Sequence, residues 1–166
     1  MRTLRTNTIA LFVLFVVIAI SSPAYARFNE GIIRGQVIGI VDGHAITVVI
    51  DDKQVRVRLA EIDAPGKKQP FGNRSKQSLS DLCFWVDAEL AIKGKDQYGR
   101  QVARVICNGV DANAEQVKRG MAWVFDKYAM DPALLKLQNE ARAEKRGLWS
   151  DKHSIPPWQW RKTHRY

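Results

Sequence analysis

Apolar residues alternate with polar ones through residues 31–62, and this alternation restricts the possible folds more than any other feature of the sequence. A period of two is typical of strands that bury one face. Asp-Gly at residues 42–43 and Asp-Asp-Lys at 51–53 are turn sequences that divide the stretch. The pattern therefore predicts a three-stranded meander with these inward positions: Val37, Gly39, Val41, Ile46, Val48, Ile50, Val55, Val57 and Leu59.

One helix and two more strands are expected after the meander. Residues 70–83 keep helical spacing, which places Leu79, Leu82 and Cys83 on one face. Residues 88–93 and 101–107 then read as strands, and Asn-Gly at 108–109 ends the second of them. The central part of the chain is thus expected to alternate between the two kinds of secondary structure.

Two more helices are expected toward the C-terminal side. The first begins at Asn113, with Gln116 three residues later as a possible capping box, and Gly120 ends it. Asp-Pro at residues 131–132 opens the second, and Gly147 ends it. The inward face of the second helix is expected to carry Leu134, Leu137 and Ala141.

This order of elements predicts an α+β fold, most simply a five-stranded OB-type β-barrel with three helices packed outside. From the pattern alone, a sandwich and a ferredoxin-like sheet remain alternatives. Lys and Arg number 26 against 17 for Asp and Glu, a net charge of +9, which favours polyanionic partners. The composition excludes collagen-like, coiled-coil and disordered classes.

Residues 1–26 have the pattern of a signal peptide. Arg2 and Arg5 form a basic start, residues 9–20 are an unbroken run of twelve apolar residues, and Ala-Tyr-Ala at 24–26 fits a cleavage site. Twelve residues are too few for a helix that spans a bilayer, although an uncleaved anchor is an alternative. We therefore expect a secreted or periplasmic protein of residues 27–166 with no stable membrane span, a single domain that includes a basic, Pro- and Trp-containing tail at 151–166.

The two cysteines are interpreted in the light of export. In an oxidising compartment, Cys83 and Cys107 are expected to pair as a disulfide, with two free thiols as the alternative. A zinc site on both cysteines is disfavoured because no C-x-x-C spacing accompanies them.

Six short motifs occur in order along the chain. They are Gly-Gln-Val at 35–37 leading to Asp-Gly at 42–43, Val-Arg-Leu at 57–59, Ile-Asp-Ala-Pro at 62–65, Gln-Pro-Phe-Gly at 69–72, Asp-Gln-Tyr-Gly-Arg at 96–100 and Arg-Gly-Leu-Trp at 146–149. Together they resemble the thermonuclease family of staphylococcal-nuclease-like OB-fold domains. The resemblance implies an exported five-stranded barrel with three helices that cleaves phosphodiester bonds in DNA and RNA with one calcium ion.

The resemblance also assigns the cationic residues of the site. Arg58 and Arg100 match the two family arginines that clamp the scissile phosphate, where a guanidinium group stabilises the negative charge that develops during cleavage. Further candidates for substrate contact are Tyr98, Lys67, Lys68 and Tyr128.

The acidic part of the matched site is incomplete. Residues 42–45 read Asp-Gly-His-Ala, so His44 stands where the family has a calcium-binding aspartate. Gly66 stands where the family has the general-base glutamate that acts on the attacking water. By resemblance, Asp63, the backbone carbonyl of Ala64 and, further out, Asp42 remain as calcium ligands.

Two functions follow as expectations. The first is a metal-dependent endonuclease acting on DNA or RNA, preferably single-stranded, whose activity is impaired by His44 and Gly66. The alternative is a nonenzymatic nucleic-acid or polyanion-binding module that has lost the calcium site. Binding of zinc by His44 with Asp63, and His44 as a replacement base, are lesser alternatives.

Three further expectations complete the sequence-based view. The protein is expected to be a monomer. The aromatic and basic residues of the tail either clamp a nucleic-acid strand or pack against the barrel. His44→Asp combined with Gly66→Glu is expected to restore calcium-dependent cleavage more than either change alone.

Overall fold

The computed structural model describes residues 31–164. The signal peptide predicted at 1–26 and its cleavage site lie outside this range, as do residues 165–166. Among the described residues, no helix has the length and hydropathy needed to cross a bilayer.

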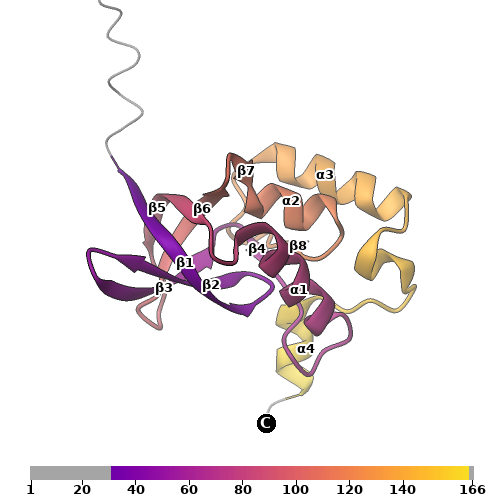
Figure 1. Ribbon diagram of the computed structural model, residues 1–166. Helices are drawn as coiled ribbons and strands as arrows, with labels where there is room; N and C mark the ends of the chain where they lie inside the picture. The colour runs from indigo at the N-terminus through magenta and orange to yellow at the C-terminus, as the bar shows by residue number, and fades with distance from the viewer. Residues whose placement is uncertain (1–30, 165–166) are drawn as a thin grey trace, which may run out of the picture.

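Five strands of the described chain close into a mixed barrel (Figure 1). They are β1 (Ile32–Asp42), β2 (Ala45–Ile50), β3 (Lys53–Leu59), β5 (Asp87–Lys95) and β6 (Gln101–Cys107). Neighbouring strands pair antiparallel in the order β3-β2-β1-β5-β6, and a parallel pairing of β3 with β6 closes the barrel. The predicted meander of residues 31–62 is confirmed as β1, β2 and β3.

Three further strands are short. Strand β7 (Val110–Asp111) extends the sheet beyond β6, and β4 (Ile62–Asp63) pairs with β8 (Trp123–Val124) in a separate two-stranded sheet. The β4–β8 pair joins the end of the meander to the segment that follows α2. It therefore carries Asp63 to the same region as the aromatic residues near 123.

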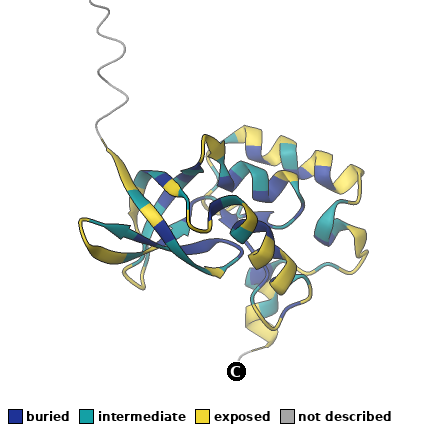
Figure 2. Cartoon of the chain, viewed as in Figure 1, coloured by how far each residue is buried: buried dark blue, intermediate teal, exposed yellow. Residues whose placement is uncertain are grey.

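The barrel interior is apolar and follows the predicted alternation except at Gly39 and Val41 (Figure 2). Val48, Val57 and Leu59 have no exposed surface, as the period of two requires. Val41, predicted to face inward, is instead 45% exposed, and its neighbour Ile40 packs against the core. The reason is an irregular pairing of β1 with β2 between Val37 and Gly39, which shifts the facing of the side chains that follow: Gly39 pairs with Thr47, and Ile40 pairs with the buried Ile46.

Four α-helices lie outside the barrel within residues 31–164, one more than predicted (Figure 1). They are α1 (Gly72–Cys83), α2 (Ala112–Lys118), α3 (Pro132–Ala143) and α4 (Pro157–Thr163), with a 3₁₀ helix, η2 (Gly147–Ser150), between α3 and α4. Helix α4 was not predicted because its two tryptophans, Trp158 and Trp160, are two positions apart and do not show a helical period. It turns part of the tail into a packed element.

The predicted capping box at the start of α2 is wrong. Asp111 is the N-cap, and its side chain accepts a hydrogen bond from the Ala114 amide. Asn113 and Gln116 are both fully buried, and their side chains bond to backbone groups of neighbouring elements. Polar residues that read as a cap therefore hold α2 against the barrel.

The disulfide and the tail fix two sides of the molecule. Cys83 at the end of α1 is bonded to Cys107 at the end of β6. On the tail, Trp158 stacks on Phe125 at 5.0 Å between ring centroids, and Gln69 donates a hydrogen bond to the carbonyl of Ile155. Of the two tail arrangements expected, the structure has the tail packed against the domain.

Candidate functional site

The predicted site residues gather at one end of the barrel, where the β1–β2 turn meets the ends of β3 and β4. The strand register brings them together: Arg58 lies opposite Ala45 on one side and Val102 on the other. Because Val102 lies two residues after Arg100, the pairing of β3 with β6 also brings Arg100 toward this end. The Leu59 amide donates to the carbonyl of His44 over 2.8 Å and fixes the turn to β3.

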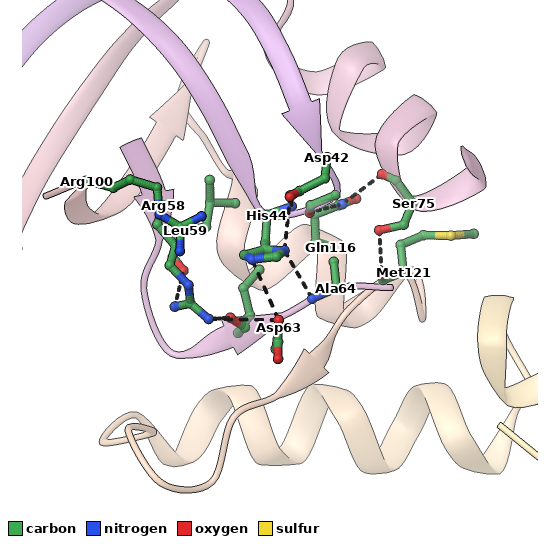
Figure 3. Close-up of polar contacts among 12 residues, drawn as sticks. Asp42, His44, Arg58, Leu59, Asp63, Ala64, Ser75, Arg100, Gln116 and Met121 are labelled. Atoms are coloured by element: carbon green, nitrogen blue, oxygen red, sulfur yellow. Dashed lines mark hydrogen bonds and ion pairs between the residues drawn. The ribbon is translucent and has the colours of Figure 1, made fainter. Parts of the chain in front are cut away.

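The β1–β2 turn contacts side chains of α1 and α2, namely Ser75 and Gln116 (Figure 3). A Cβ atom on Gly43 would lie 1.8 Å from the hydroxyl oxygen of Ser75, so only glycine fits there. Gln116 donates to the carbonyls of Gly43 and Ser75 over 2.7 and 3.1 Å. These contacts fix the position of the turn relative to the barrel, and with it the positions of Asp42 and His44.

Asp63 is the buried acid of the site, with no exposed surface. Its carboxylate accepts two hydrogen bonds from Arg161 of α4, one at 3.3 Å from Nη1 to Oδ1 and a shorter one from Nη2 to Oδ2. Arg58 Nη2 lies 3.9 Å from the same Oδ1. Both oxygens of Asp63 therefore face guanidinium groups.

His44 lies between the acids of the turn and of β4 (Figure 3). Its Nδ1 accepts a hydrogen bond from the Ala64 amide at 3.3 Å and lies 3.1 Å from Asp42 Oδ1, and its Nε2 lies 3.6 Å from Asp63 Oδ1. Burial lowers the pKa of His44 well below its usual value, and nearby positive charges lower it further. The imidazole is therefore neutral at physiological pH.

Asp42 occupies the outer position of the turn. Its Oδ1 accepts a hydrogen bond from the His44 amide at 2.9 Å, and its side chain is partly exposed. Burial raises the pKa of Asp42 above its usual value, although the His44 amide bond and the charge of Arg100 act in the opposite direction. The acid thus orders the turn.

Arg58 is a buried component of the site, with only 13% of its side chain exposed. Its guanidinium donates to the carbonyls of Leu59 and Ile62, and lies 5.9 Å from the ring centre of Phe125. Burial lowers the pKa of Arg58, and the Asp63 carboxylate opposes this effect. The guanidinium stays charged because an arginine pKa is far above neutral.

Arg100 lies at the rim of the site. Asp96 accepts a hydrogen bond from its Nε at 2.7 Å and another from its amide at 3.0 Å. The guanidinium lies 5.6 Å from the ring centre of Tyr98, whose side chain is largely exposed. At the rim, the charged guanidinium group of Arg100 therefore lies beside the exposed ring of Tyr98.

The remaining substrate candidates lie around these arginines or on the loop after β4. Tyr128 is exposed and contacts Phe125 edge to face, with 5.0 Å between ring centroids. Lys67 and Lys68 are exposed on the loop that precedes α1. Gly66 lies in that loop, and a Cβ atom added to it would meet no atom within 4 Å.

The residues present do not fit a calcium ion. Calcium takes six to eight oxygen ligands, whereas the acid at the centre of this site has both oxygens turned to Arg161 and a neutral imidazole beside it. Among residues 31–164, no group of three or more histidine, cysteine, aspartate or glutamate side chains is arranged to hold a metal. Arg161 takes the place where a cation would face Asp63.

Arg161 is the site residue whose role the sequence did not reveal. It lies 98 residues from Asp63 in the chain, within a segment that reads only as a mixture of aromatic and basic residues. The available signal was the missing aspartate at His44, since a buried acid that loses its metal needs another cation. That signal indicates a partner but not its position.

A closed five-stranded mixed barrel with helices packed outside it is consistent with an OB-fold domain. Residues 56–151 match the family model described as Staphylococcal nuclease homologue. The chain therefore belongs to the staphylococcal nuclease family.

Relatives of similar length support this membership. The chain is 41% identical over 157 residues to Protein ParB of Escherichia coli, covering 88% of this chain and 86% of that protein. It is 46% identical over 128 residues to an uncharacterized endonuclease of Haemophilus influenzae, covering 76% and 72%. It is 38% identical over 159 residues to the micrococcal nuclease of Shigella flexneri, covering 89% and 88%. Relatives at this level of identity thus include proteins named as nucleases.

Proposed function

We propose that this protein binds the phosphodiester backbone of single-stranded DNA or RNA at Arg58 and Arg100, and that the calcium-dependent cleavage implied by the family resemblance is severely impaired. The observation that carries the proposal is the double hydrogen bond from Arg161 to Asp63, which leaves guanidinium groups at the site and no free carboxylate at its centre. Binding of phosphate needs the first feature, and calcium-dependent cleavage needs the second.

The exposed aromatic rings support a single-stranded ligand. Tyr98 lies beside Arg100, and Tyr128 lies beside Phe125, whose ring is within reach of Arg58. Bases of a single strand can stack on such rings while the phosphates meet the guanidinium groups. A duplex keeps its bases stacked on one another, so it would use only the phosphate contacts.

Binding is tested by fluorescence anisotropy of a labelled single-stranded oligonucleotide over a range of salt concentrations. Affinity should fall steeply with salt because cation contacts release counterions. Arg58→Ala/Arg100→Ala should weaken binding by about tenfold or more. The matched control is Arg34→Ala/Lys53→Ala, which removes the same charge at the opposite ends of β1 and β3.

Equal losses in the two double variants would place the contact elsewhere on the surface. The same samples separate binding from cleavage when calcium is added and the oligonucleotide is analysed by length. The second candidate function is a residual endonuclease, favoured by the similarity to proteins named as endonucleases. Cleavage by the wild type that stops when calcium is chelated would establish it.

We also propose that the protein is exported to the periplasm or the medium and acts as a monomer. The signal-like segment at 1–26 and the disulfide between Cys83 and Cys107 support export. Mass analysis of the protein purified from its cells should give a chain that begins at Arg27 and carries no free thiol. Light scattering at several concentrations tests the monomer.

A further inference from the structure

The segment around Arg161 is fastened to the domain on both sides of the site. Before α4, Gln69 binds the carbonyl of Ile155 over 2.7 Å. Within α4, Pro157 is buried and Trp158 contacts the rings of Phe125 and Trp123. Arg161 follows Trp158 by three residues, so both side chains lie on the same face of the helix. The packing of Trp158 therefore aims Arg161 at the site.

The contact between Arg161 and Asp63 has the geometry of a bidentate ion pair. Nη1 and Nη2 of Arg161 each bond to a different oxygen of the carboxylate, which is the fork arrangement that arginine makes with planar anions. Asp63 has no exposed surface, and an ionised carboxylate in that position needs a cation. Arg161 supplies that charge from the protein itself.

Arg161 also retains unused donors. Its side chain is 53% exposed, in contrast to the buried acid that it binds. A guanidinium group has five N–H donors, of which the two bonds to Asp63 use two. Within residues 31–164, no other acceptor is bonded to Arg161. Three N–H donors of Arg161 thus remain available, on a guanidinium group that its two bonds to Asp63 hold in place.

Arg58 approaches the same carboxylate from the other side. Its Nη2 lies 3.9 Å from Asp63 Oδ1, the oxygen that also accepts from Arg161 Nη1. Two guanidinium groups therefore meet at one oxygen. A phosphate group placed over them can accept hydrogen bonds from both guanidinium groups.

We infer that Arg161 is a cation built into the protein in place of a metal, and that with Arg58 it forms a phosphate-binding pair that works without calcium. The ligand is a phosphate group of a single-stranded nucleic acid, so this part of the inference rests on the proposed function. The replacement of the metal by Arg161 does not rest on it, and each part has its own experiment.

The first experiment measures thermal unfolding of the full mature protein with and without calcium, and needs no nucleic acid. The background variant is His44→Asp/Gly66→Glu, which returns both missing carboxylates. With Arg161 in place, calcium should leave the unfolding midpoint unchanged. With Arg161→Gln added, calcium should raise the midpoint, because a ligand that binds only the folded state stabilises it.

Lys162→Gln in the same background is the matched control, because it removes one charge from the next residue of α4, which is exposed. It should leave the midpoint insensitive to calcium. An equal calcium response with and without Arg161 would overturn the inference, as would no response in either case. Asp63→Asn/Arg161→Gln, which removes both partners, should still unfold in one cooperative transition, which checks that loss of the pair leaves a folded protein.

The second experiment measures binding of a labelled single-stranded oligonucleotide. Wild-type affinity should be the same in calcium and in a chelator. Arg161→Gln should weaken binding about tenfold, and Lys162→Gln by less than about twofold. Equal losses in these variants, or a requirement for calcium, would overturn the inference. A wild type that binds no oligonucleotide would refute the proposed function, and the calcium experiment would still decide the role of Arg161.

Discussion

The two ends of the barrel bury their side chains by different means. At the disulfide end, formed by Cys83, Ala88, Leu90 and Cys107, the buried groups are apolar and need only to be packed together. At the polar end, formed by Asp42, His44, Arg58, Asp63 and Arg161, each buried group depends on a specific partner. The disulfide end is stabilised by burial of apolar surface, and the polar end by ion pairs and hydrogen bonds between specific partners.

The difference means that the disulfide end tolerates conservative substitutions, whereas a single substitution at the polar end changes what the site can bind. A core position accepts another apolar side chain of similar volume. At the polar end, an imidazole in place of a carboxylate removes the negative charge that a metal needs, and a guanidinium takes its place. The following predictions test this difference, from the largest expected effect to the smallest.

Calcium-dependent cleavage should need three changes at the polar end. The sequence alone predicts that His44→Asp/Gly66→Glu is sufficient, but Arg161 still holds Asp63 in that variant. Addition of Arg161→Gln should raise the cleavage rate by about 10² or more, because it frees the Asp63 carboxylate for calcium and a bound metal ion contributes several kcal/mol of charge stabilisation in the transition state. Hydrolysis of a labelled single strand measures the rate. A double variant as active as the triple would show that the tail does not obstruct the site.

Loss of the disulfide should have the largest effect on stability. Cys83 and Cys107 enclose a loop with a sequence separation of 24. Cys83→Ser/Cys107→Ser should lower the free energy of unfolding by about 3 to 4 kcal/mol, because the unfolded chain is no longer restricted. Urea denaturation measures this change. Reductant should destabilise the wild type similarly and leave the variant unaffected.

A cavity at the disulfide end should cost slightly less. Leu90 has no exposed surface and lies among the core residues of β5 and β6. Leu90→Ala should lower the free energy of unfolding by about 3 kcal/mol, from lost apolar contact and the cavity that remains. Leu135→Ala, at a partly exposed position of α3, is the control and should change stability far less. Similar losses in both variants would show that area does not govern this end.

A broken pair at the polar end should have the smallest effect on stability but the clearest coupling. Arg161→Ala leaves the Asp63 carboxylate buried, with Arg58 only 3.9 Å away as a remaining cation, and should lower the free energy of unfolding by about 2 kcal/mol. Addition of Asp63→Asn should recover about half of that loss, because the unpaired charge is gone. Additive losses in a double-mutant cycle would mean that the pair is not coupled.

The disulfide end was largely predictable because its signals are local. Alternation of apolar residues indicated the strands, and it failed only toward the polar end of β1, at Gly39 and Val41, because an irregular pairing of β1 with β2 after Val37 changes the facing. An irregularity of this kind depends on both strands at once. No single strand shows it in its own period.

The polar end was predictable in its residues but not in its pairing. The motifs indicated Arg58, Asp63 and Arg100, and the structure brings Arg58 and Asp63 within 3.9 Å. They also showed His44 and Gly66 as departures from the family pattern. The contact of Arg161 with Asp63 could not be predicted, because the residues of α4 show no helical period and the two residues are 98 positions apart.

That separation has a consequence for the order in which the molecule folds. The β1–β2 hairpin closes between Asp42 and Ala45, so its ends meet after a very small loss of chain entropy. The pair of Asp63 with Arg161 closes a loop of nearly a hundred residues, and contacts of such long range form late. The barrel should therefore assemble first, with its buried acid still open, and α4 should dock afterwards. Until α4 docks, the Asp63 carboxylate is not paired with Arg161 and stays accessible to other molecules that meet the chain.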